Sequence, residues 1–372
     1  MRDDAARMNR SDLDRLLRRL ADADGSDLHL KVGSPPRIRV NGDLLRLQDE
    51  IGPQPADLEA IAREIMHERL WENFEEHHEA DFAYAIMGLG RFRVNAYRQR
   101  GSVGMVFRLV RSSARSFDDL GLPEVIRRLA EEQRGLVLVT GPTGSGKTTT
   151  LAAMVDHSNR TRERHIVTIE DPIEVLHRDE VAAISQREVG FDTESFITAL
   201  RAALREDPDV ILVGEMRDAE TVATALSAAE TGHLVFSTLH TIDCVETINR
   251  VIDFFPANQQ KQARITLAGA LKGTICQRLV PTTDGSGRVP ALEVMVVNGR
   301  IQQTIVDPTR GTDINQIIRE GEYYGMQTFD QALVNLLEQG MIDLRAATQA
   351  ASNPHDLRVA LQQRGLVPSG AR

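Results

Sequence analysis

The sequence predicts an α/β fold, with a smaller α+β domain before the main sheet and a helical region after it. In the middle of the chain, apolar strand-like runs alternate with helical patterns, as in a buried parallel sheet. The first of these runs, 136–139, leads directly into the glycine-rich octet 141–148. Strand patterns outnumber helical ones at the start of the chain, whereas the pattern after residue 258 is mostly helical.

Residues 1–110 are expected to form the smaller α+β domain. Ser11 can cap a first helix that places four leucines on one face (Leu13, Leu16, Leu17 and Leu20), and a second helical pattern covers 58–65. Strand patterns cover 27–31, 37–40, 43–47, 81–86, 91–97 and 103–109, with a hairpin signal at Asn41-Gly42. A polar, aperiodic stretch predicts a linker at 111–117, so the core would span 118–298 and the helical region 299–372.

The octet 141–148 has the form G-x-x-x-x-G-K-[ST] of a phosphate-binding loop. Its glycines let backbone N–H groups point inward at phosphate oxygens, and the following helix adds its positive N-terminal end. Lys147 would neutralise the β- and γ-phosphates, and Thr148 would offer its hydroxyl to Mg²⁺. We therefore expect ATP and Mg²⁺ here, contacted by Gly141, Pro142, Thr143, Gly144, Ser145, Gly146, Lys147, Thr148 and Thr149.

Carboxylates follow the next two predicted strands of the core. Strand 166–169 leads into three carboxylates, Glu170, Asp171 and Glu174, one of which can orient or deprotonate the attacking water. Of these we choose Glu174 as the catalytic residue. A solvated acidic turn is the alternative, and the phosphate loop upstream favours the catalytic role. Strand 209–213 delivers Glu215, which we expect to hold Mg²⁺ and position water rather than merely pair with Arg217 or cap a helix.

Histidines bracket the fourth strand of the core, at 234–238. His240 follows this strand at the same sheet end as Lys147 and Glu215, where it can contact the γ-phosphate and report its loss. The residues alone support a buried structural histidine equally well. His77 and His78 lie in a charged run that is typical of a solvated helix face rather than a metal site.

Composition argues against several classes of protein. The chain has 372 residues and a formal net charge of −10, so it lacks the basic footprint of a dedicated nucleic-acid binder. Its two cysteines, Cys244 and Cys276, form no C-x-x-C pair, so their spacing indicates neither a zinc site nor a disulfide framework. Apolar runs fall short of the roughly 18 residues that span a bilayer, and residues 1–10 are too polar for a secretory signal. These features predict a cytoplasmic protein.

Together these elements resemble the secretion-type ATPases, and most closely the PilT-type retraction motors of type IV pili. Nearly the whole chain takes part, with similar segments at 26–30, 37–43, 141–148, 168–174, 186–190, 203–218, 229–241 and 325–330. The resemblance implies a PAS-like N-terminal domain, a RecA-like P-loop ATPase core and a homohexameric ring. Within it, Glu170–Glu174 lies at the family's Asp box, Glu215 at its Walker B glutamate and His233–His240 at its His box.

The resemblance also gives a role to arginines of the N-terminal domain. Arg91, Arg93, Arg98, Arg100 and Arg108 cluster in its last two predicted strands, where arginines are usually surface charges. In a ring, a neighbouring subunit can supply an arginine that neutralises charge on the transferred phosphate. The family directs N-terminal arginines towards ATP at the subunit junction, which favours Arg93, Arg98 and Arg108 as catalytic residues.

The resemblance favours retraction, since the four-cysteine zinc site and the extra N-terminal domain usual in polymerising relatives are not found here. It implies a motor at the inner face of the cell membrane that acts on a membrane-embedded, PilC-like platform protein, with no nucleic acid involved. One departure is Gln302, which replaces the arginine of the family's Ala-Ile-Arg-Asn-Leu-like motif. Two alternatives stay open, a nucleotide-dependent scaffold with little turnover and a DNA translocase on the same core.

Overall fold

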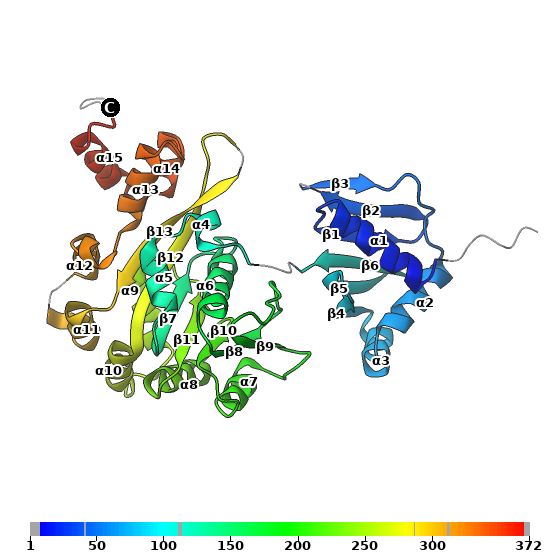
Figure 1. The fold of residues 1–372 in the computed structure, drawn as a ribbon, viewed down its shortest axis with the longest axis horizontal. Coiled ribbons are helices and arrows are strands. Elements are labelled where there is room, and N and C mark those ends of the chain that lie inside the picture. The colour runs from blue at the N-terminus through cyan, green and yellow to red at the C-terminus, as the bar shows by residue number, and fades with distance from the viewer. Residues whose placement is uncertain (1–7, 41, 111–113, 286, 311–312, 368–372) are drawn as a thin grey trace, which may run out of the picture. The chain divides into compact units, whose positions relative to one another are not determined.

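The computed structural model describes residues 8–40, 42–110, 114–285, 287–310 and 313–367 (Figure 1). The chain divides into two compact units, 1–113 with 174–176 and 114–173 with 177–372. Each unit is considered by itself. Within the described ranges, no helix has both the length and the apolar character needed to cross a membrane.

The first unit is an antiparallel sheet with helices packed against it. The strand order is β3-β2-β1-β6-β5-β4. The strands are β1 (Asp27–Lys31), β2 (Ser34–Val40), β3 (Asp43–Arg46), β4 (Glu79–Ile86), β5 (Gly90–Gln99) and β6 (Ser102–Leu109). The helices α1 (Arg10–Asp22), α2 (Pro55–Ile65) and α3 (Glu68–His77) bury their apolar faces in one core with the sheet.

The predicted elements of this unit are observed, with ends shifted by a few residues. The four leucines of α1 are fully buried because their spacing places them on one helix face. The expected cap was wrong: Asn9 caps α1, accepting the Ser11 and Asp12 N–H groups, and Ser11 lies inside the helix. The predicted hairpin signal includes Asn41, and the predicted linker includes 111–113, which lie outside the described residues.

The second unit is built on a seven-stranded sheet in the order β13-β12-β7-β11-β10-β8-β9. Its strands are parallel except for β13, which pairs antiparallel with β12. They are β7 (Gly135–Thr140), β8 (His165–Glu170), β9 (Ala183–Glu188), β10 (Val210–Val213), β11 (Leu234–Leu239), β12 (Leu271–Pro281) and β13 (Arg288–Val296). Two hydrophobic clusters cover the two faces, and alternate residues of β7 belong to each of them.

Among the described residues, seven helices belong to this part of the unit; α4 and α5 precede β7, and the others lie in the connections between strands of the sheet. They are α4 (Phe117–Leu120), α5 (Glu124–Ala130), α6 (Lys147–Thr161), α7 (Phe196–Ala203), α8 (Ala219–Glu230), α9 (Cys244–Asp253) and α10 (Gln260–Ala270). Two strands of the sheet were missed from sequence. β9 is polar and only partly buried, so it shows no apolar run, and β12 follows α10 without any turn residue between them.

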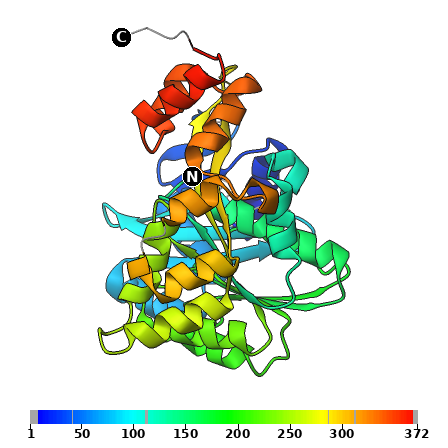
Figure 2. The ribbon, with the colours of Figure 1, turned by 90° about the vertical axis from the view of Figure 1, so that its left-hand side faces the viewer.

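The C-terminal part of this unit is helical, as predicted. It contains α11 (Gly299–Val306), α12 (Ile314–Arg319), α13 (Phe329–Glu338), α14 (Leu344–Ala350) and α15 (Pro354–Gln363). The last three pack on one another and gather in orange and red at the top of Figure 2. Arg278 of β12 links these helices to the sheet. Its Nη1 donates to the Ala350 carbonyl at 2.6 Å, and its guanidinium lies 3.8 Å from the centre of the Phe329 ring.

Candidate active site

The phosphate loop connects the buried strand β7 to α6, whose N-cap is Gly146. Gly141 has φ +143°, and a Cβ there would lie 2.4 Å from the Gln277 carbonyl oxygen and 2.6 Å from Ser145 Oγ. Gly146 has φ +92°, and a Cβ there would lie 2.6 Å from Gln277 Nε2. The loop therefore needs glycine at both positions, because both the backbone conformation and the space exclude a side chain.

The interior of the loop presents polar groups that suit phosphate oxygens. The Lys147 ammonium is largely buried and donates to the carbonyl oxygens of Gly141 at 2.8 Å and Pro142 at 3.1 Å. Ser145 Oγ is buried and has no hydrogen-bond partner in the described part of the chain. An unpartnered buried hydroxyl is costly, and a phosphate oxygen would satisfy it. The cradle thus fits the phosphates of ATP.

The remaining residues assigned to the nucleotide lie on the same loop and on the first turn of α6. Pro142, Thr143 and Gly144 are exposed at the loop tip, whereas Thr148 and Thr149 are partly buried. Thr148 directly follows Lys147, at the position from which its hydroxyl can reach a bound Mg²⁺.

A glutamine beneath the loop was missed from sequence. Gln277 of β12 is almost fully buried, and its Oε1 accepts a hydrogen bond from Thr150 Oγ1 at 2.8 Å. It thereby joins β12 to the first turn of α6. The only signal that could have identified it is its place on β12, and that strand was itself not predicted.

Glu215 and His240 lie together at the carboxyl ends of β10 and β11. The Glu215 carboxylate lies 3.3 Å from His240 Nε2 through one oxygen, and the other accepts from Arg217 Nε at 2.8 Å. Thr238 Oγ1 donates to the Gly214 carbonyl at 2.6 Å, which joins the two strand ends. Because β11 also pairs in parallel with β7, this edge of the sheet carries the phosphate loop as well.

The two glutamates of the acidic stretch after β8 lie in different environments, one buried and one exposed. Glu170 ends the strand and is buried, accepting hydrogen bonds from Thr168 Oγ1 at 2.6 Å and Gln186 Nε2 at 3.1 Å. Glu174 is exposed on the following loop and forms no hydrogen bond or ion pair with other described residues. Of the three carboxylates after this strand, the one buried at its end is therefore Glu170 rather than the chosen Glu174.

His233 lies at the other end of β11 from His240. Its Nδ1 is 3.0 Å from the carbonyl oxygen of Ala228, at the end of α8. It directly precedes the strand and does not share the sheet edge with Lys147 and Glu215.

The three candidate arginines of the first unit have different surroundings. Arg98 projects from the helix-covered face of β5, donates to both Glu59 oxygens at 3.1 and 2.8 Å, and lies over the Phe74 ring. Arg93 and Arg108 face each other across β5 and β6 on the opposite face of the sheet. Arg108 donates to Asp27 at 2.8 Å, whereas Arg93 is exposed and has no hydrogen bond or ion pair within the described ranges.

The pKa of Asp27 reflects this pairing. Burial raises it, but hydrogen bonds from Ser26 and Arg108 outweigh burial, so the Asp27 pKa lies below its ordinary value. Arg108 is therefore engaged within its own unit, whereas Arg93 is not.

Comparison with known proteins finds relatives that match most of this chain. A family model described as type II/IV secretion system protein matches residues 88–331. The type IV pilus retractation ATPase PilT of Pseudomonas aeruginosa is 46% identical over 93% of this chain and 99% of its own. A twitching motility protein of Neisseria gonorrhoeae is 43% identical over 87% of this chain and 86% of its own.

A solved structure gives the same result. The crystal structure of the pilus retraction motor PilT with bound ADP has a TM-score of 0.85 and 45% identity, and the match covers 93% of this chain and 98% of that one. The predicted α/β fold and the resemblance to PilT-type ATPases are confirmed by these matches. The chain belongs to the type II/IV secretion system protein family.

Proposed function

We propose that this protein is a Mg²⁺-dependent ATPase that powers retraction of a type IV pilus, and with it twitching motility, as a subunit of a homohexamer. One observation carries the enzymatic part: the phosphate loop, Glu215 and His240 lie at the same edge of the parallel sheet. The similarity to a pilus retraction ATPase over nearly the full length of both chains supports the motor role.

The residues of the loop and the sheet edge have distinct tasks in hydrolysis. ATP supplies the γ-phosphoryl group, and a bound Mg²⁺ would neutralise charge on its phosphates. Lys147 exchanges the carbonyl oxygens of Gly141 and Pro142 for phosphate oxygens, and Ser145 gains a partner for its hydroxyl. Thr148 and Glu215 would hold the metal, Glu215 would also orient the attacking water, and His240 would sense the γ-phosphate beside it. Glu174 remains a candidate for the same water.

Arginines from a neighbouring subunit complete the site. Of the three candidates, Arg93 is the one that has no carboxylate partner among the described residues, so it is free to approach a phosphate without first breaking an ion pair. Arg108 lies opposite Arg93 and could also approach the phosphate, provided that its ion pair with Asp27 is broken first. Hydrolysis in this arrangement needs at least two chains.

Work is delivered at the inner face of the cell membrane. The chain is proposed to be cytoplasmic and to associate peripherally with the membrane by binding the PilC-like platform protein. Residues 1–110 and 118–298 are proposed to be two domains joined by the linker 111–117, followed by the helical region 299–372. Gln302 is exposed on α11, on the element where the family motif places an arginine.

The test is phosphate release from ATP and Mg²⁺ by the full chain over a range of protein concentrations. A specific rate that rises with concentration is expected, because each site is completed by another subunit. Tight ATP binding with a flat rate near zero would instead support the scaffold, and a salt-sensitive stimulation by duplex DNA would support the translocase. Expression in Pseudomonas aeruginosa that lacks PilT tests retraction itself, with Gln302→Arg as a matched variant; failure of both chains to restore twitching counts against that role.

A further inference from the structure

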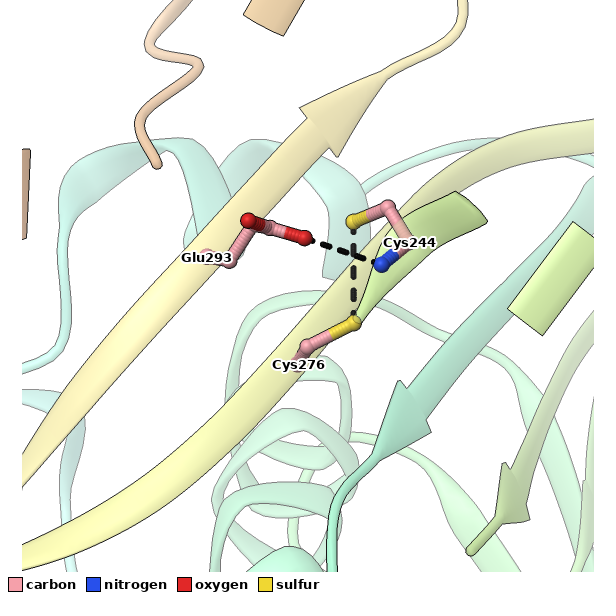
Figure 3. A group of neighbouring side chains, drawn as sticks. All are labelled: Cys244, Cys276 and Glu293. Atoms are coloured by element: carbon pink, nitrogen blue, oxygen red, sulfur yellow. Dashed lines mark hydrogen bonds between the residues drawn. The ribbon is translucent and has the colours of Figure 1, made fainter. Parts of the chain in front are cut away.

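Two thiols and a carboxylate meet in the core of the second unit (Figure 3). Cys244 begins α9, Cys276 lies in β12 and Glu293 in β13. The two sulfur atoms are 3.6 Å apart, and Glu293 Oε1 accepts the Cys244 backbone N–H at 2.9 Å. One ligand atom from each residue lies within 4.8 Å of the other two, and all three residues are buried.

The register of the sheet explains why these groups meet. Cys276 lies opposite Glu293 on β13 and opposite Thr140 on β7, so the three side chains share one face. Thr140 Oγ1 donates to Cys276 Sγ at 3.1 Å. Cys244, the first residue of α9, joins this row through its contacts with Cys276 and Glu293.

The cluster is incompletely satisfied by the protein alone. Within the part of the chain that the structure describes, Glu293 forms no ion pair, although it is only 4% exposed. A carboxylate buried in this way is costly without a compensating charge. Thr274 Oγ1 is also buried without a hydrogen-bond partner, and as the second residue before Cys276 it lies on the same face of β12.

A network of neutral thiols accounts for only part of this arrangement. Cys244 Sγ can donate to Cys276 Sγ or to the Thr274 carbonyl at 3.9 Å, which satisfies the sulfur atoms. It leaves the buried Glu293 carboxyl without an ion pair, since Arg278 acts on it only from beyond ion-pair distance, and it leaves the Thr274 hydroxyl unpartnered. A cation at the centre of the cluster would supply the missing positive charge and could take the hydroxyl as a ligand. The sulfur separation suits one, since two thiolates bound tetrahedrally to zinc at about 2.3 Å lie about 3.8 Å apart.

We propose that Cys244, Cys276 and Glu293 bind one zinc-class divalent cation, with the Thr274 hydroxyl offering a fourth ligand. Binding converts two thiols and one Zn²⁺ into a zinc dithiolate and releases two protons. Its ligands differ from the residues proposed for Mg²⁺, although Thr140, which donates to Cys276, directly precedes Gly141 of the phosphate loop. The cation fastens the first residue of α9, directly after the segment that carries His240, to β12 and β13.

The full chain, produced in cells grown in cobalt-supplemented medium and purified without nucleotide, tests the site. Cobalt is the probe because Co²⁺ bound by thiolates absorbs in the near ultraviolet, and incorporation during synthesis avoids the need to open the core. About one equivalent of cobalt per chain is expected, together with the thiolate-to-cobalt band. Since the chain has only Cys244 and Cys276 as thiols, the band reports this cluster alone.

Variants separate a metal site from core packing. Cys276→Ala should abolish the band, and Glu293→Gln should weaken cobalt retention by about tenfold or more against a competing chelator. Ile248→Val, at a buried position on the same helix, should leave both unchanged. If Cys276→Ala fails to fold, the cobalt content and the thiolate band of the wild-type chain still test the proposal. A folded chain without cobalt, or with cobalt but without the thiolate band, overturns the proposal.

Discussion

His240 Nε2 lies 3.3 Å from one oxygen of Glu215, while Arg217 Nε lies 2.8 Å from the other. The carboxylate proposed to position water is therefore oriented by a cation on one side and by an imidazole on the other. Since Thr238 Oγ1 bonds the Gly214 carbonyl, the two strand ends that carry Glu215 and His240 are joined directly. A substitution of either side chain should therefore change the position of the other.

Glu215→Gln should lower kcat by about 10²–10⁴-fold, because an amide cannot accept the proton of the attacking water. ATP affinity should be nearly unchanged, since Lys147 and the loop hold the phosphates. Steady-state phosphate release and binding of a fluorescent ATP analogue measure the two effects. Glu220→Gln, an exposed position on α8 paired with Arg201, is the matched control. Equal losses in binding and turnover would argue against the assigned role.

His240→Asn should reduce turnover less than Glu215→Gln does, because it removes a contact to the carboxylate rather than the carboxylate itself. The double variant should be no slower than Glu215→Gln alone, because residues in contact are coupled. Measuring kcat for the four chains of this cycle gives the coupling. Fully additive losses would mean that His240 acts independently of Glu215.

Arg93→Ala and Lys147→Ala should each be nearly inactive alone, yet active when mixed. The first keeps an intact phosphate loop, and the second keeps the arginine that a neighbour needs. A mixed assembly therefore contains complete sites if arginine acts between subunits. Phosphate release across mixing ratios measures this, with Lys261→Ala, an exposed lysine on α10, as the control for loss of a positive charge. No recovery at any ratio would exclude Arg93 from this role.

Arg108→Ala should make the stability of the first unit less dependent on pH in acid. The Asp27 pKa is lowered in the folded state, so its pairing stabilises at neutral pH and is lost as the pH falls through that lowered value. The effect at pH 7 should be about 1 kcal/mol or less, because Arg108 is solvent-exposed and its removal also relieves repulsion from Arg93.

Urea unfolding followed by tryptophan fluorescence measures this difference, since the single tryptophan, Trp71, is buried in the first unit. The wild type and Arg108→Ala should differ near neutrality and converge in acid. A difference that persists below the pH at which Asp27 is protonated would mean that Arg108 stabilises through other contacts.

Gly141→Ala should destabilise the nucleotide-free second unit far more than Gly144→Ala. Both glycines have positive φ, but a Cβ at Gly141 meets the Gln277 carbonyl, whereas one at Gly144 meets nothing within 4 Å. Backbone strain alone costs about 1–3 kcal/mol for a side chain at positive φ, and the clash adds to it only at Gly141. Thermal unfolding by circular dichroism compares the two variants. Similar losses would mean that the loop shifts to make room.

Local sequence patterns were sufficient to predict most of the fold. The run before Gly141 and the buried strands that precede Glu215 and His240 are continuous apolar segments, so their strand character needs no tertiary information. β9 and β12 could not be predicted in this way, because one is polar and the other continues from a helix without a turn. Their place in the sheet depends on pairing with neighbours.

In the site, too, some features follow from local sequence and others depend on strand pairing. Glu215 and His240 could be placed together because parallel strands end at a common edge. The meeting of Cys244 with Cys276 depends on the register of β12 with β7 and β13, which sequence does not reveal. Arg98 could have been separated from Arg93 by the alternation of side chains along β5, since the two residues differ in parity.

β12 connects the phosphate loop directly to the C-terminal helices through two consecutive residues. Gln277 bonds the first turn of α6 beneath the phosphate loop, and the very next residue, Arg278, is bonded to the end of α14 and stacked on α13. Neighbouring residues of one extended strand cannot be displaced independently. A displacement of the loop that moves Gln277 should therefore also move Arg278. Because one peptide unit separates the two residues, the displacement should reach the C-terminal helices with little loss.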